Sequence, residues 1–142
     1  MHLNPNISWP LSDILEVTGG VVLTGKQSIG FTGINTDSRQ IAPQECFVCL
    51  KGDNHDGHQF IPSVLQKGVH GVIMDQAAIS QKLLAALDDA GTSCIVVKDT
   101  LVALGDLASF LRQRSGLSVL ALTGSNGKTT TTTLIGEMLR QK

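Results

Sequence analysis

The stretch Thr123-Gly124-Ser125-Asn126-Gly127-Lys128-Thr129-Thr130 carries the strongest structural signal in this chain. An apolar segment, 117–122, precedes it and is expected to form a buried strand, while 129–139 is expected to continue as a helix. A glycine turn between a strand and a helix directs several backbone N–H groups and the positive end of the helix dipole at one point. This arrangement predicts a phosphate-binding loop.

The residue types in the loop support that prediction. Gly124 and Gly127 allow the backbone to approach an anion and to adopt positive φ. Lys128 supplies a positive charge for outer phosphates, and the Thr129 hydroxyl is suited to coordinate Mg²⁺. The alternative is a glycine turn without a ligand, which the Gly-Lys-Thr sequence directly after an apolar segment disfavours. The residues predicted to bind a nucleotide are Thr123, Gly124, Ser125, Asn126, Gly127, Lys128, Thr129 and Thr130.

The loop departs from the general P-loop pattern, which has a glycine five residues before Gly127, where this chain has Leu122. The shortened loop resembles the ATP loop of the Mur ligases, which build the peptide of the bacterial cell wall, and of their folylpolyglutamate synthetase relatives. In the folate enzymes a glycine usually follows the lysine. Thr129 at that position therefore favours the Mur ligases.

Other motifs resemble the same family, in the same order along the chain. Asn35–Arg39, Cys46–Gly52 and Asp56–Phe60 are similar to the Asp-Ser-Arg, Phe-Val-Ala-Leu-Lys-Gly and Asp-Gly-His motifs of its N-terminal domain. These motifs belong to the Mur ligases that add the third residue or the terminal dipeptide. Residues 97–108 resemble the start of their ATP domain. The Leu-Lys-Gly and Gly-Ser-Asn sequences are closest to the ligases that add D-alanyl-D-alanine.

The resemblance implies an α/β protein with a small mixed α/β substrate domain, 1–97, followed by the start of a P-loop ATPase domain, 98–142. It implies a ligase that uses ATP and Mg²⁺ to join D-alanyl-D-alanine to UDP-N-acetylmuramoyl-tripeptide through an acyl phosphate. Lys128 would be the catalytic residue, since it would neutralise charge on the transferred phosphoryl group, and Thr129 would be the Mg²⁺ ligand. The positions assigned to the UDP part of the substrate are Ser38, Arg39, Asn54 and His55.

Several alternatives remain open. A ligase that adds the third peptide residue shares most of these motifs, and a non-catalytic UDP-sugar-binding module is a different class, which would not need the P-loop. Arg39 suits a phosphate because its planar fork makes paired hydrogen bonds, but an internal salt bridge with Asp37 is equally consistent with its position. The polar stretch 53–58 is either a solvated turn or part of the substrate site, and no second cluster completes a metal site there.

Composition narrows the class of protein. A net charge of −1 offers no basic surface for nucleic acid, and no apolar run approaches the ~20 residues that span a bilayer. The three cysteines do not form a paired disulfide framework, and the N-terminus does not resemble a secretory leader, so we expect a cytoplasmic protein without membrane insertion. We also expect a monomer. Because 142 residues are far fewer than a Mur ligase needs, we expect a part of a longer enzyme that is inactive alone.

Apolar periodicity predicts alternating helices and strands. We expect helices over 10–18, 59–67, 79–90 and 101–114, and strands over 21–24, 31–36, 45–50, 71–74 and 93–97. The helix 101–114 is expected to present one apolar stripe, made of Leu104, Leu107, Ala108 and Leu111. Cys46 and Cys49 have the Cys-x-x-Cys spacing of some metal and redox sites, but on a strand they face opposite sides, which favours core packing.

Overall fold

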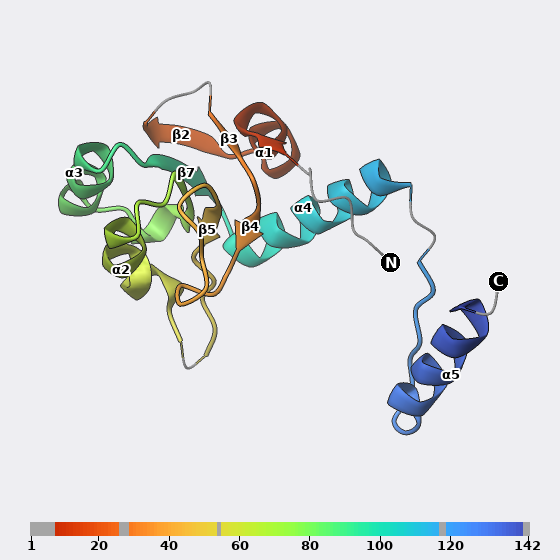
Figure 1. The fold of residues 1–142 in the computed structure, drawn as a ribbon. Coiled ribbons are helices and arrows are strands. Elements are labelled where there is room, and N and C mark those ends of the chain that lie inside the picture. Colours follow the sequence, from red (N-terminus) through yellow and green to blue (C-terminus); the bar gives the residue numbers. More distant parts are fainter. Residues whose placement is uncertain (1–7, 26–28, 54, 117–118, 141–142) are drawn as a thin grey trace.

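A five-stranded sheet lies at the centre of the fold, with the strand order β2-β7-β6-β5-β4 (Figure 1). The structure is a computed structural model that describes residues 8–25, 29–53, 55–116 and 119–140. Strands β4 to β7 run parallel, whereas β2 pairs antiparallel with β7 at one edge. The strands are β2 (Val21–Thr24), β4 (Ile34–Asn35), β5 (Cys46–Val48), β6 (Gly71–Asp75) and β7 (Ser93–Val97). A separate antiparallel pair joins β1 (Trp9–Pro10) to β3 (Gly30–Phe31).

Helices cover both faces of this sheet, so the inner strands are apolar on both sides. One face packs against α1 (Leu11–Thr18) and α4 (Thr100–Ser115), and the other against α2 (Ile61–Gln66) and α3 (Gln81–Asp89). Short 3₁₀ turns precede α2 and α3, namely η1 (Gly57–Phe60) and η2 (Gln76–Ala78). The α/β fold class expected from the sequence is confirmed, with a mixed sheet that is mostly parallel.

The alternation of side chains along β5 explains the burial of its cysteines. Cys46 and Val48 belong to the core under α1 and α4, whereas Phe47 and Cys49 belong to the core under α2 and α3. The expectation that the two thiols face opposite sides is confirmed. Burial raises the pKa of both thiols, and it raises the pKa of Cys94 to about 11, so these groups remain protonated core residues.

Helix α4 is anchored at both ends. The Asp99 side chain accepts hydrogen bonds from the backbone N–H groups of Leu101 and Val102, at 2.8 and 2.9 Å, which is a standard N-cap. Near the other end, Arg114 pairs with Asp13 of α1 at 2.6 Å. The helix therefore packs with the first part of the chain.

The apolar stripe of α4 differs in part from its prediction. Ala103 and Leu107 are buried, and Leu104, Phe110 and Leu111 pack against the same core. Ala108 is exposed, so its place in the stripe was wrong. Phe110 takes part because it meets Trp9, with ring centroids 6.1 Å apart, and that contact depends on where α1 and β1 lie.

Several element boundaries also moved. The expected strand 31–36 is divided between β3 and β4, and the expected helix 59–67 is divided between η1 and α2. Helix α3 begins at Gln81 because the Ser80 side chain accepts from the backbone N–H of Leu83 at 3.2 Å and caps the helix there. These differences of one or two residues arise from capping and turn geometry, which hydrophobic periodicity does not encode.

The last described element is α5 (Lys128–Arg140), which lies apart from the sheet in Figure 1. The helix expected after the glycine loop is confirmed, but the strand expected before it is not found. Residues 117 and 118 lie outside the described part, and 119–122 have no regular structure, with Val119 and Leu120 exposed by 64% and 68%. A strand needs a hydrogen-bonded neighbour, and no strand among the described residues pairs with this segment.

Candidate functional site

The predicted phosphate-binding loop lies at the N-terminus of α5. Gly124 and Gly127 have φ angles of +157° and +77°. The second angle lies in the left-handed region, where a residue with a side chain would be strained. The first helical hydrogen bond runs from the backbone N–H of Thr131 to the carbonyl of Gly127, at 2.9 Å. The backbone N–H groups of residues 128–130 therefore come before this first helical hydrogen bond. They lie at the N-terminus of α5, and this is the end of a helix that attracts anions.

The side chains at this helix end match the chemistry of a nucleotide loop. Lys128 is the first residue of α5, and its ammonium group folds back to donate a hydrogen bond to the carbonyl of Gly124. Thr129 is exposed in the first turn, and its hydroxyl is a hard oxygen ligand of the kind that Mg²⁺ prefers. The residues of this loop therefore fit an anion and a divalent cation.

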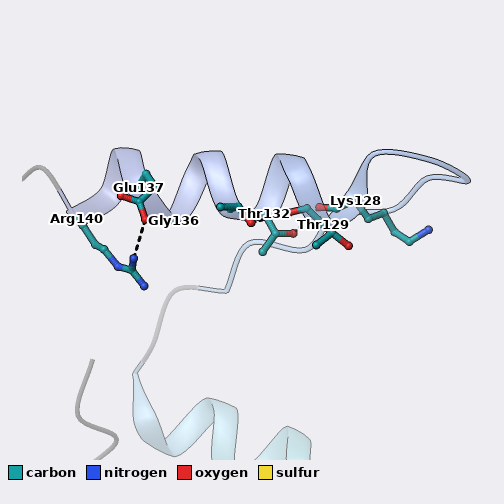
Figure 2. A pocket seen from close by; sticks show the side chains of 7 residues that line it. Lys128, Thr129, Thr132, Gly136, Glu137 and Arg140 are labelled. Atoms are coloured by element: carbon teal, nitrogen blue, oxygen red, sulfur yellow. Dashed lines mark hydrogen bonds and ion pairs between the residues drawn. The ribbon is translucent and has the colours of Figure 1, made fainter.

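An open groove continues from this point along α5 (Figure 2). It is lined by Lys128, Thr129, Thr132, Thr133, Gly136, Glu137 and Arg140. At its far end, Arg140 and Glu137 form an ion pair of 2.8 Å. Only the end at Lys128 and Thr129 coincides with the predicted loop, because the other lining residues come from later turns of the helix.

A second set of predicted residues forms a tightly hydrogen-bonded turn after β4. The Asn35 side chain accepts from the backbone N–H of Asp37, and the Asp37 side chain accepts from the backbone N–H of Arg39, both at 2.9 Å. The Arg39 guanidinium lies alongside the same carboxylate, with Nε to Oδ1 at 2.9 Å and Nη2 to Oδ2 at 2.8 Å. The internal salt bridge that the sequence left open is therefore present.

This salt bridge shapes the charge of the turn. Hydrogen bonds from the Arg39 side chain and backbone lower the pKa of Asp37 to about 2, so the carboxylate is ionised at neutral pH. The Arg39 side chain is 85% exposed, and a side-on pair uses only two of the five guanidinium N–H donors. The remaining donors lie at the surface of the molecule.

Lys67 holds this turn from outside. Its ammonium group donates to the backbone carbonyls of Ser38 and Arg39, at 2.8 Å in each case. Lys67 follows α2 and is 28 residues from Arg39, so no local sequence pattern predicted the contact. The backbone of the predicted UDP turn is therefore fixed by a residue that the sequence did not single out.

The third predicted segment is the loop 51–56, which follows β5. Lys51 and Asp56 form an isolated antiparallel bridge, and the Gly52 N–H donates to the carbonyl of His55 at 2.8 Å. His55 is exposed at this loop, and Asn54 lies outside the described residues. These two contacts bring the ends of the loop together, and the His55 side chain is open to solvent.

The parallel sheet places two of these segments at one edge. The turn 37–39 follows β4 and the loop 51–56 follows β5, and the carboxyl ends of neighbouring parallel strands lie side by side. Ligands of open α/β sheets bind at this edge. The glycine loop 123–130 belongs to the separate segment that leads to α5, so the structure does not bring it to the sheet.

Two other kinds of site are not found in the described part of the chain. No group of three or more His, Cys, Asp or Glu side chains there is placed to hold a metal ion. Within the same residues, no helix is both long enough and apolar enough to cross a bilayer. Within its described residues the stretch 53–58 is hydrogen-bonded as a turn, and its place in a substrate site stays a prediction.

A family model described as "Mur ligase family, catalytic domain" matches residues 30–112, more than half of the chain. The chain belongs to the Mur ligase family. The resemblance of its motifs to this family is therefore confirmed.

Individual Mur ligases match over most of the chain. A UDP-N-acetylmuramoyl-tripeptide--D-alanyl-D-alanine ligase of Treponema pallidum is 40% identical over 116 residues, which are 80% of this chain and 25% of that protein. A UDP-N-acetylmuramoyl-L-alanyl-D-glutamate--2,6-diaminopimelate ligase of Alkaliphilus metalliredigens is 34% identical, over 91% of this chain and 25% of that protein. Both types of Mur ligase therefore resemble this chain.

Solved structures agree with the fold. A crystal structure of MurF from Acinetobacter baumannii superposes with a TM-score of 0.79 at 33% identity, covering 96% of this chain and 28% of that one. The chain thus spans about a quarter of the length of the Mur ligases that it matches.

Proposed function

We propose that this chain is the N-terminal part of an ATP-dependent Mur ligase that joins D-alanyl-D-alanine to UDP-N-acetylmuramoyl-tripeptide in peptidoglycan synthesis. Residues 1–97 bind the UDP-linked substrate, and 98–142 begin the ATP-binding domain. The complete protein is a cytoplasmic monomer, and the 142 residues alone do not catalyse ligation. The named ligases and MurF structures among its relatives support this choice of substrate.

The glycine loop at the N-terminus of α5 is the observation that carries the proposal. Gly127 adopts positive φ, Lys128 begins the helix and Thr129 follows it in the first turn. A UDP-sugar-binding module alone has no need of this combination, which provides backbone donors, a cation and a hard oxygen ligand for a polyphosphate. The loop residues 123–130 are therefore assigned to ATP.

The reaction follows from the chemistry of the two substrates. The terminal carboxylate of the UDP-linked peptide attacks the γ-phosphorus of ATP, ADP leaves, and an acyl phosphate forms. The amine of D-alanyl-D-alanine then attacks the acyl carbon, and inorganic phosphate leaves. Lys128 exchanges its bond to the Gly124 carbonyl for the outer phosphates and neutralises charge as the phosphoryl group is transferred. Thr129 holds Mg²⁺, which supplies further positive charge to the phosphates.

The UDP part of the substrate is assigned to the carboxyl edge of the parallel sheet. Ser38 and Arg39 present it with a turn whose backbone Lys67 fixes, and His55 approaches it from the next loop. Asn54 is assigned to it from the resemblance to the family alone. Arg39 keeps its pair with Asp37 and offers its exposed donors to the phosphates. The pairing orients the guanidinium before the ligand arrives, which reduces the entropy that binding must overcome.

The first experiment determines the mass of the native gene product and follows the reading frame past Lys142. We expect the frame to continue into further strands and a second acidic metal ligand. Ligation and ADP release are then measured on the complete protein and on its Lys128→Ala variant, with Lys82→Ala on the exposed side of α3 as the control. Loss of Lys128 is expected to lower kcat by ~10²–10³. Near-normal turnover in the variant, or a product that ends at Lys142, would contradict the proposal.

A second candidate function is that of the ligase that adds the third peptide residue. The similarity of this chain to the diaminopimelate ligase of Alkaliphilus metalliredigens supports it. Assaying the complete protein with UDP-linked dipeptide and tripeptide as acceptors separates the two. Ligation to the tripeptide alone supports the first candidate, and ligation to the dipeptide alone supports the second. Binding of a uridine nucleotide without ligation of either acceptor would favour the non-catalytic module.

A further inference from the structure

His58 lies at the centre of a chain of hydrogen bonds beside the proposed UDP loop. Its side chain is only 9% exposed. Nδ1 is 2.5 Å from Oδ1 of Asp56, and Nε2 is 3.0 Å from the backbone nitrogen of Asp75. The ring therefore connects the end of the loop 51–56 with the end of β6.

The tautomer of this ring follows from its partners. A backbone N–H can only donate, so Nε2 must accept from Asp75 and cannot carry a proton. The proton of the neutral imidazole is therefore on Nδ1, which donates it to the Asp56 carboxylate. Hydrogen bonds from the His58 side chain and backbone lower the pKa of Asp56, which keeps this acceptor charged.

The chain of contacts continues into α4. Oδ1 of Asp75 accepts from the backbone N–H of Thr100 at 2.9 Å, and the buried hydroxyl of Thr100 donates to the carbonyl of Cys49 at 2.8 Å. Thr100 is the first residue of α4, and Cys49 directly follows β5. The first turn of the helix is thus held by residues at the ends of two neighbouring strands, and one of them, Asp75, is itself bonded to His58 through its backbone N–H.

We propose that His58 is a positioning residue that links the loop 51–56 to the first turn of α4. The proposal rests on the proposed function, since it takes the loop to hold the UDP-linked substrate and α4 to lead to the ATP loop. A substrate that orders the loop orders the start of α4 through Asp56, His58 and Asp75. A buried histidine that only filled space would not couple the loop to α4. The coupling needs both ring nitrogens bonded, one to Asp56 and the other to Asp75.

Two variants break the link on opposite sides. In His58→Asn the amide nitrogen can take the place of Nδ1 and keep Asp56, but nothing accepts from Asp75. In His58→Gln the amide oxygen can take the place of Nε2 and keep Asp75, but the donor to Asp56 is lost. His70→Gln is the matched control, since His70 is exposed and its hydrogen bonds with Pro43 and Ser93 run through its backbone. If the His58 variants fold poorly, Asp56→Asn weakens the same contact with His58 at a side chain that is 35% exposed, so the fold is disturbed less.

Hydrogen exchange on the complete protein, followed by mass spectrometry, reads both ends of the link. Without ligand, we expect about fivefold faster exchange at 75 and 100–103 in His58→Asn, and at 51–56 in His58→Gln, as for the loss of one hydrogen bond. With UDP-N-acetylmuramoyl-tripeptide, the wild-type protein gains protection at 51–56 and 100–103, whereas each variant gains it at 51–56 alone. The control behaves as wild type.

The outcomes separate the link from the proposed function. Ligand protection that still reaches 100–103 in both variants would overturn the link, as would unchanged exchange at 75 and 100–103 in ligand-free His58→Asn. If the ligand protects neither segment in the wild-type protein, the substrate assignment fails. The ligand-free pattern of the two variants then still decides whether His58 joins the loop to α4.

Discussion

The replacement Gly57→Ala tests how closely the loop 51–56 is packed against the strand before it. A Cβ at this position would lie 2.8 Å from both the backbone nitrogen and the backbone oxygen of Leu50, and 3.0 Å from the carbonyl carbon of Cys49. These neighbours are main-chain atoms next to β5, so they cannot rotate away as a side chain would. The backbone of the loop must move instead.

The cost can be estimated from three contributions. Overpacking a tight site costs ~1–3 kcal/mol. Separating the two backbones also strains the hydrogen bond from the Gly57 N–H to the Leu50 carbonyl, now 2.8 Å, which is worth about 1 kcal/mol. Alanine restricts the unfolded chain and returns ~0.4–1 kcal/mol. We expect a net loss of about 2 kcal/mol in the free energy of unfolding.

Trp9 provides the assay. It is the single tryptophan of the sequence, it is 6% exposed, and it lies in the core under α1 and α4, so its fluorescence reports urea unfolding of the sheet region. Gly105→Ala in α4 is the matched control, because a Cβ there meets nothing within 4 Å, and it is expected to stabilise by up to about 1 kcal/mol. An unfolding free energy of Gly57→Ala within ~0.5 kcal/mol of wild type would refute the reasoning.

Three further predictions concern the turn and the helix cap. Lys67→Met removes both hydrogen bonds to the turn 37–39 and should weaken binding of the UDP-linked substrate about fivefold, while the control Lys82→Met should not. Equal affinities of Lys67→Met and the wild-type protein by calorimetry would contradict this role of Lys67. The pKa of Asp37 is lowered to about 2, so its contribution to stability is complete above its ordinary value of 3.8 and is lost as the pH falls through about 2. In Arg39→Gln the titration midpoint of Asp37, followed by NMR, should rise towards 3.8, and an unchanged midpoint would show that Arg39 is not the cause. Asp99→Ala should cost ~1 kcal/mol in urea unfolding, because two N–H groups of α4 lose their acceptor, and no change would mean that water replaces the cap.

Much of the fold was predictable because its strands are short apolar runs separated by turn residues. The strand 93–97 was predicted at its observed limits, and 71–74 was short by one residue. The strand expected over 117–122 was not found in its described residues, 119–122, since apolar composition makes a strand possible but only a paired neighbour makes one. Phe110 replaced Ala108 in the stripe of α4 because its contact with Trp9 comes from a distant element.

The candidate site divides in the same way. The glycine loop and the helix after it were predicted, because glycine, lysine and threonine at those spacings act through local backbone geometry. The choice between a phosphate and Asp37 as the partner of Arg39 stayed open in the sequence, and the structure shows the Asp37 pair. The division at Val97/Lys98 and the ligand roles of the loop residues stay predictions.

By itself, the sequence determined the α/β class, the opposite facing of Cys46 and Cys49 on their strand and the glycine turn at the start of α5, while anion binding by that turn stays a prediction. Each depends on residues close together in the chain, through side-chain alternation or helix-end geometry. Only the tertiary structure decided the roles of Lys67 and His58, because their partners lie up to 29 residues away and meet them through the parallel arrangement of the strands. A parallel sheet brings distant strand ends together at one edge, and no local pattern of residue types specifies which side chains then touch.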